Sequence, residues 1–150
     1  MTSVPPSSTS TCLFCRLIAG DEPVSRVGDD GDAIAVLDPR PINPGHTLVL
    51  PAAHASGLTE LSEEAGLAVW RLTHRVAVAL RRAHGWCEGV TLHLADGKAA
   101  DQDIPHVHLH VIPRLNGDGL ELTERKPPGR PTRAELDETA ATLSRLLTPE

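Results

Sequence analysis

Apolar residues occur along the chain in short runs and in one long periodic segment, with polar loops between them. Short runs in which apolar and polar positions alternate are typical of strands with one buried face. We expect five strands, at residues 25–27, 33–37, 47–50, 90–94 and 107–112. Asp30-Gly31, between the first two, is a hairpin signal because glycine tolerates the positive φ of tight turns.

Three helices are expected beside these strands. The longest begins after Ser62 and ends at Gly85, and its apolar positions recur with the helical period of about 3.6 residues. A short helix fits residues 13–19, and Thr132 with Glu135 forms a capping box that begins a last helix. Together these elements predict an α+β fold. It consists of a five-stranded, mostly antiparallel sheet with one long helix packed on it, plus a C-terminal helix.

Histidine occupies one whole face of the last predicted strand. His106, His108 and His110 alternate with aliphatic residues before a proline. Successive side chains of a strand point to opposite faces, so the three imidazoles share one face at intervals of about 6.6 Å. An imidazole can act as nucleophile, acid, base or metal ligand near neutral pH. A partly solvated strand is the alternative, and we favour the chemical interpretation because histidine takes three consecutive positions of one face.

Composition narrows the class of protein. The chain has 150 residues, of which 40% are apolar and only 2% aromatic, which fits one globular domain with an aliphatic core. The net charge of -6 gives no electrostatic support for binding nucleic acid. No apolar run approaches the roughly 20 residues that span a bilayer, and we expect no secretory signal. Nucleic acid and membrane are therefore excluded from the expected partners.

The two ends of the chain differ from its middle. Residues 1–11 are rich in Ser, Thr and Pro and are expected to form a disordered tail. A single domain is expected from 12 to 150, with a C-terminal extension over 116–150 that carries the last helix at about 132–147. Residues 116–131 are rich in Gly, Pro and charge, which predicts a long connection.

Cys12-Leu-Phe-Cys15 is a candidate metal-binding motif. The Cys-x₂-Cys spacing lets two thiolates bind one Zn²⁺, and two more ligands would complete a tetrahedron. His54 and His106 are candidates, although spacing alone does not separate them from the eight histidines of the chain. A thioredoxin-type redox pair is the main alternative, but no βαβ unit surrounds the motif. Three cysteines are too few for a disulfide scaffold, so a reducing, cytoplasmic setting is expected.

Three motifs follow one another along the chain: Cys12-Leu-Phe-Cys15, Pro44-Gly-His46-Thr-Leu-Val, and His106-Val-His-Leu-His110 followed by Ile-Pro-Arg. In this order the chain resembles the histidine triad (HIT) family of nucleotide-binding hydrolases and transferases. The resemblance runs from about Cys12 to Arg114, and its separations are similar to those of a bacterial, zinc-bearing member. It implies a HIT-like fold and a homodimer formed through the long helix and a central strand.

The resemblance implies roles for the histidines. His108 would be the nucleophile on the α-phosphorus, and His46 and His110 would flank it as hydrogen-bonding partners of the phosphate. His106 would be either a further hydrogen-bonding member or, in zinc-bearing members, the fourth metal ligand. The ligands of this structural zinc would be Cys12, Cys15, His54 and His106.

A nucleotide-binding pocket is implied in the same way. Asp38 would accept hydrogen bonds from the ribose hydroxyls, with a turn aspartate as the alternative. The apolar slot for a purine would consist of Phe14, Leu17, Ile18 and Leu37. Phe14 is equally interpretable as a core residue. In the loop before the triad, Gln102 and Asp103 would lie beside the phosphate, and the expected ligand is a purine nucleotide, an AMP or GMP conjugate.

This loop departs from the usual family pattern of Asn, a Gly-rich segment, Gly-Gln and a small hydroxyl residue. Ala95 stands in the Asn position, Asp101 in that of the Gly before Gln102, and Asp103 in that of the hydroxyl residue. Two like charges about 5 Å apart repel by roughly 3 kcal/mol at an effective dielectric near 20. If Asp101 points inward, phosphate affinity falls or the pocket prefers a less charged substrate. If it points outward, little changes.

We therefore expect a histidine-triad nucleotide hydrolase. It would cleave at the α-phosphate of a phosphoramidate, an acyl nucleotide or a dinucleoside polyphosphate, through a nucleotidyl-histidine intermediate. A nucleotide-binding or regulatory module with vestigial activity is an alternative, supported by the altered loop. A nucleotidyltransferase is another, because it shares the intermediate. No catalytic metal is expected, since the sequence holds no evident magnesium carboxylate cluster.

Overall fold

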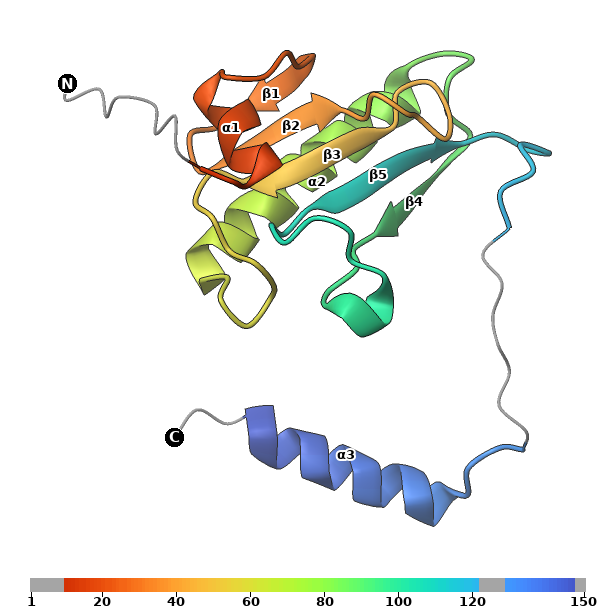
Figure 1. Ribbon diagram of the computed structural model, residues 1–150. Helices are drawn as coiled ribbons and strands as arrows, with labels where there is room; N and C mark the ends of the chain where they lie inside the picture. The colour runs from red at the N-terminus through yellow and green to blue at the C-terminus, as the bar shows by residue number, and fades with distance from the viewer. Residues whose placement is uncertain (1–9, 122–128, 148–150) are drawn as a thin grey trace. The chain divides into compact units, whose positions relative to one another are not determined.

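The computed structural model describes residues 10–121 and 129–147 (Figure 1). The chain separates into two compact units, Met1–Asp118 and Gly119–Glu150. Residues 1–9 of the expected tail at 1–11 lie outside the described residues. Residues 122–128 of the expected connection at 116–131 also lie outside them. The single domain from 12 to 150 stays a prediction.

A five-stranded sheet forms the centre of the first unit, which confirms the predicted α+β fold. Its strand order is β1-β2-β3-β5-β4, and the four pairings between neighbours are antiparallel. The strands are β1 (Arg26–Asp29), β2 (Ala33–Leu37), β3 (Thr47–Pro51), β4 (Gly89–His93) and β5 (Leu109–Arg114). β1 and β4 are the two edges, and β5 lies between β3 and β4, so His110, the histidine within β5, has a paired strand on either side.

The turn between β1 and β2 is the hairpin that Asp30-Gly31 predicts. Gly31 has a φ of +92°, a conformation that glycine adopts without strain. The carboxylate of Asp29 accepts the Gly31 N–H at 2.8 Å, and the carboxylate of Asp30 accepts the Ala33 N–H at 2.9 Å. Short aspartate side chains therefore satisfy the backbone donors of this turn.

The long helix α2 (Glu63–Arg82) packs on one face of the sheet (Figure 1). Ser62 caps the helix, because its Oγ accepts the N–H of Ala65 at 3.2 Å. The negative charges of Glu63 and Glu64 in the first turn stabilise the helix by interacting with its positive N-terminal end. Alanines on β2 let the helix approach the strands closely. The buried cluster of this face is Ala33, Ala35, Val49, Ala68, Val69, Leu72, Val76, Leu80 and Val111.

The short helix α1 (Leu13–Ala19) contributes to a second core on the opposite face of the sheet. Ile34 and Val36 belong to this core, whereas Ala33 and Ala35 face α2, as strand alternation requires. Its buried members are Phe14, Ile34, Val36, Leu48 and Leu50. This second face also carries the histidines, so α1 and the catalytic candidates share one side of the sheet.

β5 begins at Leu109, two residues later than the sequence predicts. The β3–β5 register pairs Leu48 with His110 and Val49 with Leu109, so Val107 would stand opposite Pro51. Proline has no N–H to donate to the ladder, and the pairing stops before it. The Val107 N–H donates instead to the carbonyl of Ala55, at 2.8 Å. His106 and His108 are therefore held by the loop after β3 and by α1.

The second unit contains the predicted C-terminal helix, α3 (Arg133–Leu147). Thr132 and Glu135 form the predicted capping box. The Thr132 N–H donates to the Glu135 carboxylate at 2.7 Å, and the Glu135 N–H donates to Thr132 Oγ1 at 3.3 Å. Both start and end of the helix lie within one residue of the sequence prediction.

Candidate active site and metal centre

Two histidines of the triad contact the ring of Phe14, and the third contacts the ring of His108. His106 and His108 are buried, with 0% and 4% of their surface exposed, and His110 is half-buried. The Phe14 ring centroid lies 5.8 Å from that of His106 and 5.1 Å from that of His108. The ring centroids of His108 and His110 are 5.1 Å apart, and His108 precedes the first residue of β5.

A backbone carbonyl fixes the protonation of His108. Its Nδ1 lies 2.8 Å from the carbonyl oxygen of His106, and a carbonyl oxygen only accepts hydrogen bonds. The neutral ring therefore carries its hydrogen on Nδ1 and has a free lone pair on Nε2. Because burial and this hydrogen bond hold the ring in place, Nε2 is positioned as a nucleophile.

His46 and His110 are linked in a directed chain of hydrogen bonds. The Ile42 N–H donates to Nδ1 of His46 at 3.1 Å, so the hydrogen of the neutral His46 ring is on Nε2. Nε2 then donates to Nδ1 of His110 at 2.9 Å. His110 is left with its own hydrogen on Nε2, where it can donate to an anion.

Burial keeps both rings of this pair uncharged at neutral pH. Burial lowers the pKa of His110 to about 4, with smaller contributions from His108, His46 and His93. Burial also lowers the pKa of His46, although the Asp38 carboxylate opposes the shift from 3.7 Å. Burial outweighs the carboxylate in its effect on the pKa of His46, because only 3% of the His46 side chain is exposed. The pair therefore acts through neutral N–H donation.

Asp38 follows β2, and its side chain has two contacts. Its Oδ1 accepts the Arg40 N–H at 2.9 Å, which is the contact of a turn aspartate. Its Oδ2 faces Nε2 of His46, and 18% of its side chain is exposed. One carboxylate oxygen is thus used by the turn, and the other borders the histidine cluster from the end of β2.

The apolar slot differs in one residue from the sequence prediction. Phe14, Leu17 and Ile18 pack together on the α1 face. Leu37 does not join them, because it has the same strand parity as Ala35 and points to the α2 face. Val36, one residue earlier, takes the place that was expected for Leu37.

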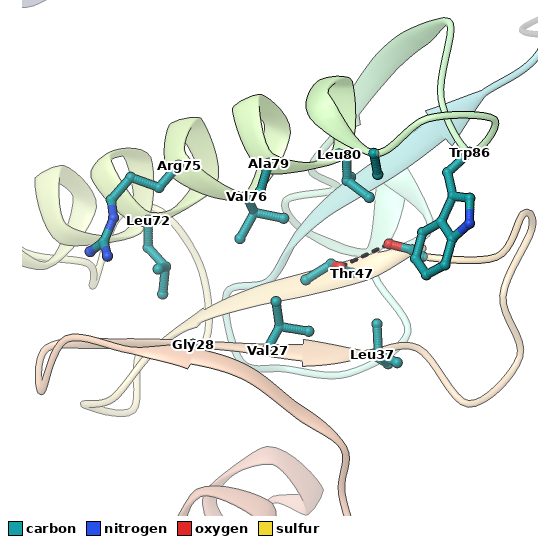
Figure 2. A pocket seen from close by; sticks show the side chains of 12 residues that line it. Val27, Gly28, Leu37, Thr47, Leu72, Arg75, Val76, Ala79, Leu80 and Trp86 are labelled. Atoms are coloured by element: carbon teal, nitrogen blue, oxygen red, sulfur yellow. Dashed lines mark hydrogen bonds between the residues drawn. The ribbon is translucent and has the colours of Figure 1, made fainter.

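Leu37 lines an apolar groove on the α2 face instead (Figure 2). The groove lies between the second half of α2 and the strands β1 to β3, has a volume of about 490 Å³ and holds one charged residue, Arg75, among its lining. Its other lining residues are Val27, Gly28, Leu37, Gly45, Thr47, Leu72, Val76, Ala79, Leu80, Ala83 and Trp86. None of the predicted catalytic histidines lines it.

The four predicted zinc ligands come together in one cluster. The possible ligand atoms of Cys12, Cys15, His54 and His106 all lie within 4.8 Å of one another. Sγ of Cys15 is 3.3 Å from Nδ1 of His54, and Sγ of Cys12 is 3.5 Å from Nδ1 of His106. Two sulfurs and two nitrogens at such distances form the donor set that tetrahedral Zn²⁺ prefers.

The chemistry of these donors also fits a cation. Nε2 of His106 is 3.0 Å from the carbonyl of Pro51 and must donate to it, which leaves the Nδ1 lone pair directed at the cluster. Burial raises the pKa of the Cys15 thiol, and the neighbouring Cys12 raises it further. A cation would reverse both effects. The cluster therefore fits a metal better than two free thiols.

The loop before the triad has a rigid frame. Gln102 donates both amide N–H bonds to backbone carbonyls, to Ser56 at 2.7 Å and to Ile104 at 2.9 Å. Its Oε1 accepts the Gly97 N–H at 2.8 Å. In this conformation Gln102 has no N–H left for a phosphate, so it shapes the loop rather than contacting the expected ligand.

The two aspartates of this loop lie differently. Asp101 has a φ of +59°, in the left-handed region where glycine is more easily accommodated, and it is exposed. Asp103 has one carboxylate oxygen 3.4 Å from Nε2 of His108. The acidic group closest to the expected nucleophile is therefore Asp103.

His93 is a site residue that the sequence analysis missed. It lies on the edge strand β4, pairs in register with His110, and its ring centroid is 5.8 Å from that of His110. Residues paired across an antiparallel ladder share one face, so His93 extends the row of imidazoles. Strand alternation in β4 could have suggested its face, but only the β4–β5 register brings it beside His110.

Fold and site together define a histidine triad protein. The HIT domain family model matches residues 19–117, and the chain belongs to this family. A HIT-like protein of Mycobacterium tuberculosis is 42% identical over 123 residues, which are 79% of this chain and 85% of that protein. An adenosine 5′-monophosphoramidase of Schizosaccharomyces pombe is 33% identical over 106 residues, 71% of this chain and 76% of that protein.

A solved structure has the same fold. The zinc-bound histidine triad protein of Mycobacterium smegmatis matches with a TM-score of 0.71 at 35% identity, over 91% of this chain and 97% of that one. Among the residues described by the structure, no helix is both long and apolar enough to cross a membrane.

Proposed function

We propose that the protein is a hydrolase that cleaves purine nucleotide conjugates at the α-phosphate. The observation that carries this proposal is the orientation of the His108 ring, whose Nδ1 lies 2.8 Å from a backbone carbonyl, so that Nε2 is the nitrogen available for attack. The expected substrates are conjugates of AMP or GMP, joined to the leaving group by a P–N or P–O bond. The similarity to an enzyme named as an adenosine 5′-monophosphoramidase supports the P–N case.

The reaction would have two displacement steps. In the first, the lone pair of His108 Nε2 forms a bond to the α-phosphorus, and the bond to the leaving group breaks. An amine leaving group takes up one proton as it departs. In the second step, water attacks the nucleotidyl-histidine, the P–N bond to His108 breaks, and the water gives up one proton. The products are the free amine and a nucleoside monophosphate.

The neighbouring histidines would stabilise the transferring group. The neutral His110 carries its hydrogen on Nε2 and would donate it to a phosphoryl oxygen. His46 would hold His110 in that tautomer, and Asp38 would accept a ribose hydroxyl with the oxygen that faces His46. Phe14, Leu17, Ile18 and Val36 would line the slot for the base.

Zinc would have a structural role. Cys12, Cys15, His54 and His106 would hold it, and it would neutralise two thiolates and tie α1 to the loop after β3 and to the start of the triad. Because His106 also fixes the Nδ1–H of His108 through its carbonyl, the cluster would hold the nucleophile in position. None of the proposed steps requires the metal to contact the substrate.

A nucleotide-binding module with vestigial activity is the second candidate. Its support is the loop, in which Asp103 approaches the nucleophile and Asp101 occupies a left-handed conformation. A transferase that passes the nucleotidyl group to phosphate would use the same first step.

Calorimetric titration with AMP tests the pocket without assuming turnover. We expect saturable binding with one site per chain, and weaker binding by Asp38→Ala because the ribose contact is lost. Absence of binding at millimolar AMP would contradict both the hydrolase and the binding module.

We also propose a homodimer in the cytoplasm. Leu67 and Trp70 are 61% and 54% exposed on α2, and β4 is an edge strand with Leu92 exposed. A second copy could cover the helix face and extend the sheet. Three free cysteines are consistent with a reducing compartment. The molar mass in solution tests the dimer.

If Asp101 faces the bound phosphate, Asp101→Gly is expected to strengthen AMP binding by around tenfold at low salt. One like-charge pair at about 5 Å contributes at most roughly 3 kcal/mol at an effective dielectric near 20, and solvent reduces this further. Glycine also accommodates the left-handed backbone without strain, which lets amide groups approach the phosphate. Calorimetry at two salt concentrations measures the change.

Asp101→Asn is the matched variant, because it removes the charge and keeps a side chain. If it gives the same gain as glycine, repulsion is the cause, and if it gives none, the backbone is. Equal AMP affinities for the parent and Asp101→Gly at low salt would show that Asp101 does not influence the phosphate.

A further inference from the structure

The nucleophile of this protein has a carboxylate beside it. Oδ1 of Asp103 lies 3.4 Å from Nε2 of His108, and it also accepts the N–H of Ile104 at 2.9 Å. The hydrogen bond anchors the carboxylate at the start of the triad segment. No other described carboxylate is placed this close to His108 Nε2 by an ion-pair contact.

A phosphorus atom under attack must share this space. The reacting atoms approach to about 3 to 3.5 Å before the bond forms. Adding this to the 3.4 Å between His108 Nε2 and Asp103 Oδ1 places the carboxylate within about 7 Å of the phosphorus, whatever the angle between them. An in-line displacement directs the leaving group away from Nε2, so a charge on it lies beyond the phosphorus and interacts with the carboxylate over a longer distance.

The rest of the loop adds to the negative potential. Residues 94–105 contain three carboxylates, Asp96, Asp101 and Asp103, and one cation, Lys98. The neutral His46 and His110 donate hydrogen bonds but bring no positive charge. A leaving group with further phosphates would increase the repulsion, whereas a cationic leaving group would be attracted.

We propose that Asp103 is a specificity-determining residue that selects conjugates with a cationic amine leaving group and disfavours polyphosphate leaving groups. This inference rests on the proposed function, since it concerns the choice among leaving groups at the same site. The carboxylate also acts on the phosphoryl group, but this group is common to all the substrates, so only the charge of the departing half changes the choice among them. Because 72% of the Asp103 side chain is exposed, the selection weakens as salt increases.

Three substrates with the same adenosine 5′-phosphoryl half test the proposal. The first is the phosphoramidate of ethylenediamine, whose far end is an ammonium group. The second is the phosphoramidate of propylamine, which has the same length without the charge. The third is diadenosine triphosphate. The measured quantity is kcat/KM for each substrate at low and at high salt.

For the parent protein we expect the ethylenediamine conjugate to exceed the propylamine conjugate by roughly tenfold at low salt. Asp103→Asn should bring this ratio close to one and increase the relative rate of diadenosine triphosphate by a similar factor. Asp103→Ser should do the same, since it restores a small hydroxyl. Glu64→Gln, which removes one exposed carboxylate from the first turn of α2, should leave both ratios as in the parent.

Two results would overturn the selection while leaving the proposed function intact. In the first, the parent hydrolyses all three substrates through His108, but Asp103→Asn changes the ratios by less than about twofold. In the second, Asp103→Asn slows all three equally while its thermal melting is unchanged, which would assign Asp103 to the common chemistry. Failure of the parent to hydrolyse any of the three would instead contradict the proposed function, and the selection with it.

Discussion

His108→Ala is expected to reduce hydrolysis of an adenosine phosphoramidate by roughly four orders of magnitude or more. The substitution removes the atom that forms the covalent intermediate, and the fixed lone pair of the neighbouring His106 is directed at the metal cluster instead. A loss of this size corresponds to about 5 kcal/mol of transition-state stabilisation. Steady-state release of AMP measures the effect.

Two controls make this result interpretable. His74→Ala removes an exposed imidazole from α2 and should retain parental activity. AMP binding and thermal melting of His108→Ala should stay near those of the parent, which separates loss of chemistry from loss of fold. Activity of His108→Ala within tenfold of the parent would exclude the covalent mechanism.

We also expect the protein to bind one zinc ion per chain, with Cys12, Cys15, His54 and His106 as its ligands. The Cys12→Ser, Cys15→Ser double variant should contain almost no zinc after purification without chelator. If zinc is present at about a hundred times its Kd, its binding stabilises the fold by about 2.7 kcal/mol. For a chain of this size, the melting temperature should then fall by on the order of 10 °C when the metal is removed.

Elemental analysis and thermal melting test this prediction together. Cys87→Ser is the matched control, because Cys87 is half-buried, lies outside the cluster and donates to the carbonyl of Gly89. It should keep its zinc. An unchanged zinc content in the double variant would reject this ligand set, and a parent protein without zinc would reject the metal itself.

Local sequence patterns predicted most of the fold. Capping residues, strand alternation and turn glycines are short-range signals, and they placed α1, α2, α3 and the β1–β2 hairpin within a few residues. The start of β5 was predicted two residues early, because the reason for it lies elsewhere in the chain. Pro51 stands opposite Val107 only after β3 and β5 have paired.

The sequence could name the histidines but not their protonation. The tautomers of His106 and His108 depend on the carbonyls of Pro51 and His106, whose directions follow from the tertiary fold. The prediction placed Leu37 on the wrong face of the sheet. Alternation along the predicted strand at 33–37 puts Leu37 on the same face as Ala33 and Ala35, so the sequence itself contained the correct answer.

Two further features depended on tertiary distances. His93 comes beside His110 through the register of β4 and β5. Asp103 comes beside His108 through a loop whose shape Gln102 holds with three hydrogen bonds to the backbone. A sequence shows that a carboxylate replaces a hydroxyl, but not which atom that carboxylate approaches.

The stereochemical course at phosphorus tests the central claim most directly. The substrate is an adenosine phosphorothioamidate of one configuration at phosphorus, hydrolysed in water enriched in heavy oxygen. Two in-line displacements, first by His108 and then by water, each invert the phosphorus, so the account predicts a product with net retention. Net inversion would show that water attacks the substrate directly, and it would contradict a nucleotidyl-histidine intermediate.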